Sequence, residues 1–334
     1  MYRVFSCIMG YMKKKPSVSV VVASHRPAMV SGLLHSLLRQ RECTVVLEVL
    51  VVTDYPNGDL QRDFPAMQWT YIADTSISVK RNRGASAARA PVLAFIDDDC
   101  IAASDWVERG YAWLIRHPHC AAVEGYTSIE SNSGYAPQAL REYRRLEKRG
   151  FRTNNLFIRT ASFREAGGFD ERFTVQREDI DLAFTMMDRG MTIGYSRDIG
   201  VTHRFRHWET WDLLKNCWNR RFDPLLFKKH PKRYLTMFGI PLPPTQVVML
   251  LLHLLFLLTV GRKRRTGAAA GCAEIVAALF FGIRRSGMRP FLPRKLLLES
   301  LQIVLAPVVT VAALVCGGGK AVSCPDSRSR TPGI

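Results

Sequence analysis

The stretch "VLAFIDDDC", residues 92–100, decides the expected fold. Five apolar residues are followed without a break by the three acids Asp97, Asp98 and Asp99. A short continuous apolar run is typical of a strand that is buried on both faces of a parallel sheet. Adjacent carboxylates repel one another, and their pKa values rise unless an opposite charge lies between them. The stretch therefore predicts a buried strand whose carboxyl end faces a cation.

The chain before this stretch predicts a βαβ unit. The β-branched run "VSVVVAS" at 18–24 and the run "LEVLVV" at 47–52 read as buried strands. Between them, apolar residues recur at helical spacing after Pro27, which suits a first helical turn. We therefore expect an α/β fold in which the three acids stand at the carboxyl edge of the sheet, where ligands bind in open α/β sheets.

Further strands and helices are expected on both sides of the acids. The expected strands are 68–74, 120–130, 154–160 and 191–196, and the expected helices are 83–90, 105–117, 136–150, 162–169 and 178–190.

Composition and charge favour a membrane partner over a nucleic acid. The 334 residues carry a formal charge of +18 and are 47% hydrophobic. Basic clusters such as "GRKRR" at 261–265 flank apolar segments, which suits anionic lipid headgroups. The eight cysteines are scattered without a C-x-x-C pair, which argues against a disulfide scaffold and a zinc site and for a reducing, cytosolic setting.

The composition changes near residue 232. We expect an N-terminal extension at 1–15 that is not a signal peptide, a catalytic domain at 16–232, a membrane-associated helical region at 233–316 and a disordered tail at 317–334.

Three apolar segments of the helical region, 245–260, 267–283 and 301–316, are candidate membrane helices. The positive-inside rule makes the first one a re-entrant or interfacial segment if the catalytic domain is cytoplasmic. The alternative is a set of buried core helices or a soluble oligomer interface.

The stretch "RNRGASAARA" at 81–90 is a candidate anion site. Its small residues, with Asn82 among them, predict a turn into a helix whose N-terminal amides suit a phosphate. Lys80, Arg83 and Arg89 would add hydrogen-bond donors. The alternative is a helix that uses its small residues only for close packing.

Other acids and one histidine are candidate site residues, each with a structural alternative. Asp54 ends a strand and could accept a hydrogen bond from a nucleobase, or it could be a turn residue before a proline. Glu178 and Asp179 open a helix whose dipole favours ionised carboxylates, so that Asp179 could act as a general base, or both could only decorate the first turn. His203 lies near the end of a possible strand and could be either structural or a ligand.

The order of seven segments resembles family 2 glycosyltransferases, which are inverting enzymes of the GT-A fold. The segments are "VVVASHRP", "VVTD", "NRGASAARA", "FIDDDC", "NNLFIRT", "AGGFDERF" and "EDIDLAF", and they span about residues 16–207. The resemblance implies a nucleotide-diphospho-sugar transferase fold, which is Rossmann-like with a mostly parallel sheet, followed here by hydrophobic C-terminal helices.

The resemblance also implies roles for individual residues. Asp97 and Asp99 match the D-x-D pair that holds a metal ion and the diphosphate, and His203 matches a further metal ligand of some members. Asp54, Arg89, Asn82, Lys80 and Asp98 would contact the nucleotide. Asp179 matches the catalytic base, with Glu178 as its neighbour. One departure is Thr53, because the family often has a second acid before the base-binding one.

These observations predict a glycosyltransferase that inverts configuration and depends on Mn²⁺ or Mg²⁺. Its co-substrate would be a nucleotide-diphospho-sugar, its acceptor a lipid-linked or cell-surface glycan, and its setting cell-envelope polysaccharide synthesis. The protein would be bound to the membrane, with its catalytic domain on the cytoplasmic face, and it would not bind nucleic acid. The alternatives are a sugar-nucleotide pyrophosphorylase and a catalytically degenerate membrane-anchored protein that binds nucleotide-sugars. The sequence leaves the sugar, the nucleotide, processivity and the oligomeric state open.

Overall fold

The computed structural model describes residues 15–40, 45–130, 140, 143–204, 211–261, 264–286 and 293–322. The chain divides into two compact units, Met1–Asn132 with Glu142–Arg206 and Ser133–Arg141 with His207–Ile334. The first unit ends well before residue 232, where the catalytic domain was predicted to end, and the functional boundaries of the four predicted regions stay predictions.

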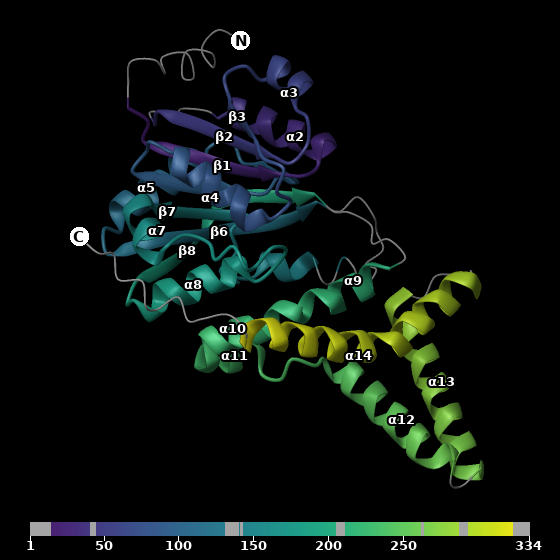
Figure 1. Cartoon of the computed structure of the whole chain (residues 1–334). Helices are drawn as coiled ribbons and strands as arrows, with labels where there is room; N and C mark the ends of the chain where they lie inside the picture. Colours follow the sequence, from purple (N-terminus) through teal and green to yellow (C-terminus); the bar gives the residue numbers. More distant parts are fainter. Residues whose placement is uncertain are drawn as a thin grey trace. The chain divides into compact units, whose positions relative to one another are not determined.

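The first unit is built on a mixed sheet with the strand order β3-β2-β1-β4-β7-β6-β8-β5 (Figure 1). Parallel pairs join β1 to β2 and β4, β2 to β3, and β6 to β8. Antiparallel pairs join β7 to β4 and β6, and β5 to β8. The strands are Val18–Ser24, Leu47–Thr53, Gln68–Tyr71, Val92–Ile96, Cys100–Ala102, Cys120–Glu130, Asn155–Arg159 and Thr192–Arg204, in the order β1 to β8.

Helices cover both faces of this sheet, which explains its apolar strands. Every residue of β1, β2 and β4 is buried. On one face, α2 (Pro27–Leu38) and α5 (Trp106–Arg116) pack against the strands. On the other face lie α4 (Ile77–Ala87), α7 (Thr160–Ala166) and α8 (Glu178–Asp188). The predicted α/β architecture is confirmed, and it fits the GT-A fold.

The structure corrects two of the predicted helices. The helix expected at 83–90 is the C-terminal part of α4, which begins at Ile77, so no helix N-terminus exists there to bind a phosphate. The helix expected at 136–150 lies partly outside the described residues, and its described part contains the 3-10 helix η2, Arg144–Glu147. The short helix α3, Gly58–Asp63, was not predicted.

Two strands, one not predicted and one longer than predicted, bring distant residues to the acidic stretch. β5 follows directly after the acids, and β8 runs to Arg204, well beyond the strand predicted at 191–196. In the antiparallel pairing of these two strands, Cys100 is opposite His203. The pairing therefore places His203 beside the end of the acidic turn.

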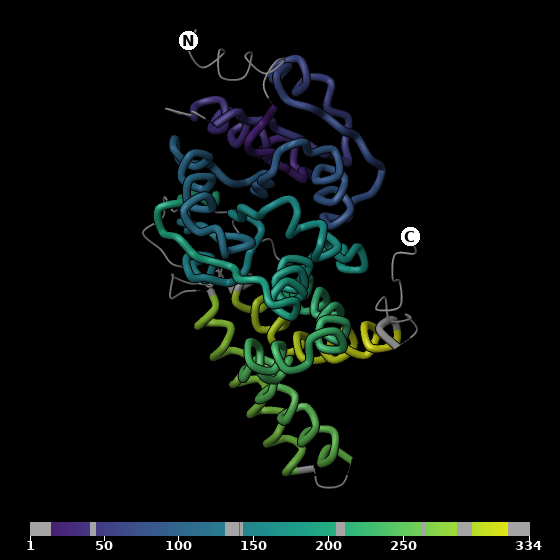
Figure 2. Tube along the Cα trace, turned by 90° about the vertical axis from the view of Figure 1, so that its left-hand side faces the viewer, coloured from purple at the N-terminus to yellow at the C-terminus, as the bar shows by residue number. Residues whose placement is uncertain are grey.

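The second unit is helical in its described residues. It contains α9 (Asp212–Asn219), η3 (Arg220–Phe222), α10 (Asp223–Lys229), α11 (Pro231–Phe238), α12 (Pro244–Val260), α13 (Arg264–Ser286) and α14 (Pro293–Val322). α12 and α13 lie side by side (Figures 1 and 2), and α14 packs on both of them and on α9, η3 and α10.

Two helices of this unit, over Arg265–Arg285 and Leu296–Gly319, are long and apolar enough to cross a membrane, whereas α12 has only 17 residues. α14 also extends to Val322, into the segment that was expected to be a disordered tail from 317.

Candidate active site

The three acids after β4 point toward three different sets of partners. Asp97 is the most exposed of them and accepts a hydrogen bond from Arg81 Nη2 at 2.7 Å. Asp98 is buried and faces the β1–α2 turn, while Asp99 faces His203 on β8. The repulsion expected between adjacent carboxylates is therefore relieved partly by cations of the protein itself.

Asp98 holds the β1–α2 turn in place through hydrogen bonds. Its Oδ2 accepts hydrogen bonds from Ser24 Oγ at 2.9 Å and from the backbone N–H groups of His25 and Arg26, each at 3.2 Å. Its Oδ1 accepts from Arg26 Nε at 3.0 Å and also from Arg26 Nη2. Since the carboxylate is 1% exposed and fully engaged, the prediction that Asp98 contacts the nucleotide is not supported, and its position indicates a structural task.

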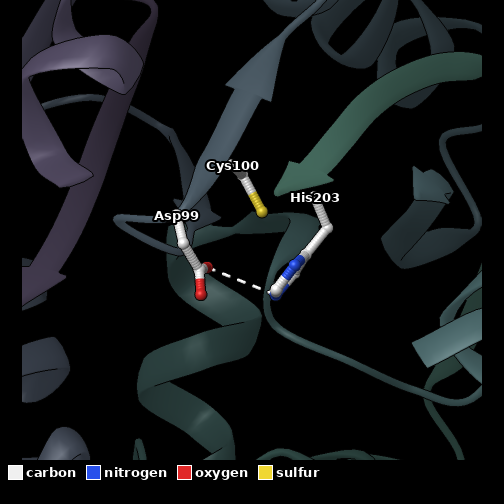
Figure 3. Close-up of side chains that lie close together, drawn as sticks. All are labelled: Asp99, Cys100 and His203. Atoms are coloured by element: carbon white, nitrogen blue, oxygen red, sulfur yellow. Dashed lines mark ion pairs between the residues drawn. The ribbon is translucent and has the colours of Figure 1, made fainter. Parts of the chain in front are cut away.

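Asp99, Cys100 and His203 form a group that could hold a metal ion, with one ligand atom of each within 4.8 Å of the others (Figure 3). His203 Nδ1 donates to the carbonyl oxygen of Arg204 at 2.9 Å, and its Nε2 lies toward Asp99. Asp99 Oδ1 is 3.3 Å from that Nε2, is buried and has no hydrogen-bond partner.

A buried carboxylate oxygen and an imidazole nitrogen at this distance need a cation between them, either the proton of a His203–Asp99 ion pair or a metal ion. A carboxylate oxygen and an imidazole nitrogen suit Mn²⁺ and other divalent first-row ions, so the residues fit the predicted metal. Cys100 would add a softer ligand atom, but burial raises the pKa of its thiol well above the ordinary value. Asp97, the other predicted ligand, is engaged with Arg81.

Arg26 is a site residue that the sequence analysis missed. Its guanidinium binds Asp98 and also contacts Asp99 Oδ2 through Nη1 at 2.6 Å. Burial disfavours the cation, but the charges of Asp99 and Asp98 outweigh this and raise the pKa of Arg26. One oxygen of Asp99 is therefore neutralised by the protein, and the other is left for a ligand.

Arg81 was also missed, and it connects the acidic stretch to α8. Its side chain is 5% exposed, with Nη2 on Asp97 and Nη1 on Glu178 Oε1 at 2.8 Å. Residue type and spacing do not predict that Arg81 bridges two acids, because Asp97 and Glu178 are far apart in the sequence. The two predicted acid sites are thus joined by a single cation.

Glu178 and Asp179 stand at the first turn of α8, as predicted. Burial, followed by the charge of Asp179, raises the pKa of Glu178 to about 7. Burial also raises the pKa of Asp179, whose Oδ1 accepts a hydrogen bond from the backbone N–H of Ile180 at 2.7 Å. The preceding Arg177 has φ 78°, a left-handed conformation that costs energy for a residue other than glycine. The chain enters α8 under strain at the place where the acids stand.

Asp54 and Lys80 are brought together. Asp54, at the end of β2, binds Lys80 Nζ through Oδ2 at 2.8 Å, and the same Nζ donates to the carbonyl oxygen of Ser24 at 3.2 Å. Lys80 is 1% exposed, so its ammonium group is held at this edge of the sheet and does not extend into solvent. The pair lies at the carboxyl ends of β1 and β2, beside the turn that Asp98 holds.

The comparisons with known proteins agree with this geometry. Residues 19–171 match the sequence pattern described as glycosyl transferase family 2. The chain carries a family 2 glycosyltransferase domain. The matched part contains the acidic stretch, Asp54 and Lys80, whereas Glu178, Asp179 and His203 lie beyond it.

Two curated relatives are similar to this chain. Both are described as validoxylamine A glucosyltransferase, one from Streptomyces hygroscopicus subsp. jinggangensis (strain 5008) and one from Streptomyces hygroscopicus subsp. limoneus. Each is 28% identical over 272 aligned positions, which cover 66% of this chain and 63% or 58% of the relative. The chain thus spans less than two thirds of the length of either relative.

Two residues predicted to contact the nucleotide have other tasks in the family 2 domain. Asn82 donates to the carbonyl oxygen of Phe169 at 2.8 Å and accepts from the N–H of the same residue at 2.9 Å, so it holds the loop before α8. Arg89 binds Glu48 near the beginning of β2, at 2.9 Å from Oε2. Because Glu48 and Asp54 lie at opposite ends of β2, Arg89 binds at the edge of the sheet opposite to Asp54, and a contact with the nucleotide stays a prediction.

Proposed function

We propose that this chain transfers a sugar from a nucleotide-diphospho-sugar to a hydroxyl group of a lipid-linked or cell-surface glycan, with inversion of the anomeric configuration. The observation that carries the proposal is the buried pair of Asp99 Oδ1 and His203 Nε2, which lie 3.3 Å apart and can both ligate a metal ion. The family 2 match favours a glycosyltransferase over a pyrophosphorylase.

Asp99 and His203 would hold the divalent cation, Mn²⁺ or Mg²⁺, with the exposed side of Asp97 toward the donor. When bound, that ion stabilises the negative charge that develops on the leaving diphosphate. The ion pair of Asp54 and Lys80 supports a nucleotide site at the same edge, since a base N–H would find a fixed carboxylate there.

Asp179 is the proposed general base. Its Oδ1 is engaged with the N–H of Ile180, so Oδ2 is the oxygen available to a proton. The acceptor hydroxyl oxygen attacks the anomeric carbon from the face opposite the diphosphate, its proton passes to Asp179, and the bond to the diphosphate breaks. The raised pKa of Asp179 suits this task, because a base works best when its pKa approaches the working pH.

The C-terminal helices support a membrane location for the acceptor. The apolar stretches of α13 and α14 are only 22% and 33% buried within the chain, whereas the core helix of a soluble protein is mostly buried. The catalytic domain would bind a lipid-linked acceptor at the bilayer surface. We place the catalytic domain on the cytoplasmic face because basic clusters flank the helices and positive residues favour that side.

The proposal is tested by the first-formed product. We would incubate the full chain in detergent with a panel of α-linked nucleotide-sugars and follow transfer to water or to a simple alcohol by proton NMR. The β-anomer as first product supports inversion, and the α-anomer contradicts it. Asp179→Asn should lower turnover by roughly 10²–10⁴-fold. An unchanged rate would exclude Asp179 as the base, and Asp181→Asn, on the same helix, is the matched control.

A further inference from the structure

Arg81 touches both the acidic stretch and α8, the helix that carries the proposed base. Its guanidinium donates to Asp97 Oδ1 from Nη2 at 2.7 Å and to Glu178 Oε1 from Nη1 at 2.8 Å. Asp97 follows β4 and Glu178 opens α8, so these acids are joined only through the folded structure. One positive charge therefore serves two carboxylates.

The helix that carries Arg81 is anchored on both sides. Ser78 Oγ donates to the carbonyl oxygen of Phe173 at 2.5 Å, and Lys80 binds Asp54 at 2.8 Å. Asn82 holds Phe169, whose ring lies 5.5 Å from the Arg81 guanidinium carbon. These contacts hold α4 where the Arg81 guanidinium reaches both carboxylates.

Glu178 is placed to respond to a change of charge nearby. Its Oε2 is buried without a hydrogen-bond partner, while Oε1 depends on Arg81. Burial and the charge of Asp179 raise the pKa of Glu178 to about 7, so its carboxyl group changes charge near neutral pH. A modest change in the local field would therefore decide whether this carboxyl group is ionised.

We propose that Arg81 is a positioning residue that relays the charge at Asp97 to Glu178 and so to the proposed base Asp179. This inference rests on the proposed function for the roles of the two ends, but the relay itself concerns only this chain's residues. When a cation held by Asp99 and His203 offsets the charge of the neighbouring Asp97, Arg81 is left to Glu178, which loses its proton. The new negative charge beside Asp179 strengthens Asp179 as a proton acceptor.

Other charged groups also act on Glu178 and Asp179. Arg81 faces Glu178 from α4, and Asp179 faces it from α8 itself. Arg177, directly before α8, and Arg152, before β7, act on Asp179. The hydrogen bonds that connect Asp97 to Glu178 are those of Arg81.

The test is the pKa of Glu178 in the full chain, measured by carbon NMR on protein that is labelled at the glutamate carboxyl and solubilised in detergent. The Glu178→Gln variant assigns the signal. We expect Asp97→Asn to lower this pKa by about one unit, because Arg81 then serves Glu178 alone. Asp59→Asn removes the same charge from an 88% exposed carboxylate on α3 and should leave it unchanged. No shift with Asp97→Asn would overturn the relay.

Two further arms separate the relay from the proposed function. In the Arg81→Gln background the shift caused by Asp97→Asn should shrink by at least half, and a shift of unchanged size would mean that Asp97 acts directly through space. Mg²⁺, which is diamagnetic and does not broaden the signal, should lower the pKa of Glu178 in the natural protein as Asp97→Asn does. If Asp97→Asn lowers it and Mg²⁺ does not, the relay stands and the proposed cation at Asp99 and His203 fails.

Discussion

At the scale of single residues, the three consecutive acids have different tasks. Asp98 fixes the β1–α2 turn, Asp99 places one oxygen against Arg26 and the other against His203, and Asp97 shares Arg81 with α8. A buried carboxylate that accepts several hydrogen bonds is costly to alter, whereas a partly exposed one is not. Substitutions at these positions should therefore separate stability from ligand binding.

Asp98→Asn should destabilise the protein by about 3 kcal/mol, because its amide group would face N–H donors where a carboxylate oxygen now accepts. The check is the melting temperature of the full chain, which should fall by roughly 10 °C. Asp59→Asn, at an 88% exposed side chain, is the matched control and should change it little. A stable Asp98→Asn variant would show that the turn does not depend on this carboxylate.

Glu178 should make stability depend on pH. Its pKa is about 7 in the folded chain and about 4.5 when unfolded, so its contribution is fully present below pH 4.5 and is lost as the pH rises through 7. The free energy of unfolding should fall in that window by a few kcal/mol at most. Glu178→Gln should flatten this part of a melting curve series between about pH 4 and 8. Parallel pH profiles for the two proteins would contradict the raised pKa.

At the scale of elements, α4 explains which parts of the site could be predicted. Its buried face consists of Ser78, Lys80, Arg81, Gly84 and Ala85, so ion pairs replace the apolar residues that mark a helix face. Apolar spacing therefore did not reveal where the helix begins. The strands β1, β2 and β4, with the acids at the end of β4, were predicted correctly because uninterrupted apolar runs depend on local sequence alone.

The bridges made by Arg26 and Arg81 could not be predicted in the same way. Each joins residues that become neighbours only when β1, β4 and α8 assemble. The long β8 was also underestimated, since polar residues such as Ser196 and Asp198 interrupt its apolar pattern. Residue types predicted which side chains could do chemistry, while tertiary distances decided which of them meet.

Gly84 tests how closely α4 approaches the sheet. A Cβ at this position would lie 2.5 Å from Val21 Cγ1. Alanine usually stabilises a helix interior relative to glycine, by about 1 kcal/mol, but overpacking against a buried strand costs about 1–3 kcal/mol. Gly84→Ala should therefore lower the unfolding midpoint in urea. Gly58→Ala, where the Cβ meets open space, should not, and equal midpoints for both variants would contradict the close approach.

At the scale of the whole molecule, the chain combines a family 2 domain with helices that expose large apolar side chains. On α12, Leu257 and Leu258 are 67% and 63% exposed, and on α13 Val276 is 65% exposed. Soluble proteins rarely leave such contiguous apolar surface in water. Between the helices, His253 and Glu274 pair at 3.5 Å and lie inside the hairpin, as expected for polar groups next to lipid.

The full chain should therefore float with vesicles of phosphatidylcholine and phosphatidylglycerol. Leu257→Asp with Leu258→Asp should lower vesicle binding by more than about tenfold, because two charged groups replace apolar side chains that the bilayer would bury. Tyr71→Asp, at a 58% exposed side chain on β3, is the control. Equal flotation of both variants would contradict membrane insertion of the α12–α13 hairpin.

The central claim is that Asp99 and His203 hold a cation that binds a nucleotide diphosphate. We would measure the melting temperature of the full chain in detergent with UDP, GDP, TDP and CMP, each with and without Mn²⁺, because a ligand that binds only the folded state raises its stability. The account predicts that one nucleoside diphosphate stabilises the natural protein only with Mn²⁺, and that Asp99→Asn abolishes this effect. Stabilisation that is the same without Mn²⁺, or that persists in Asp99→Asn, would contradict it.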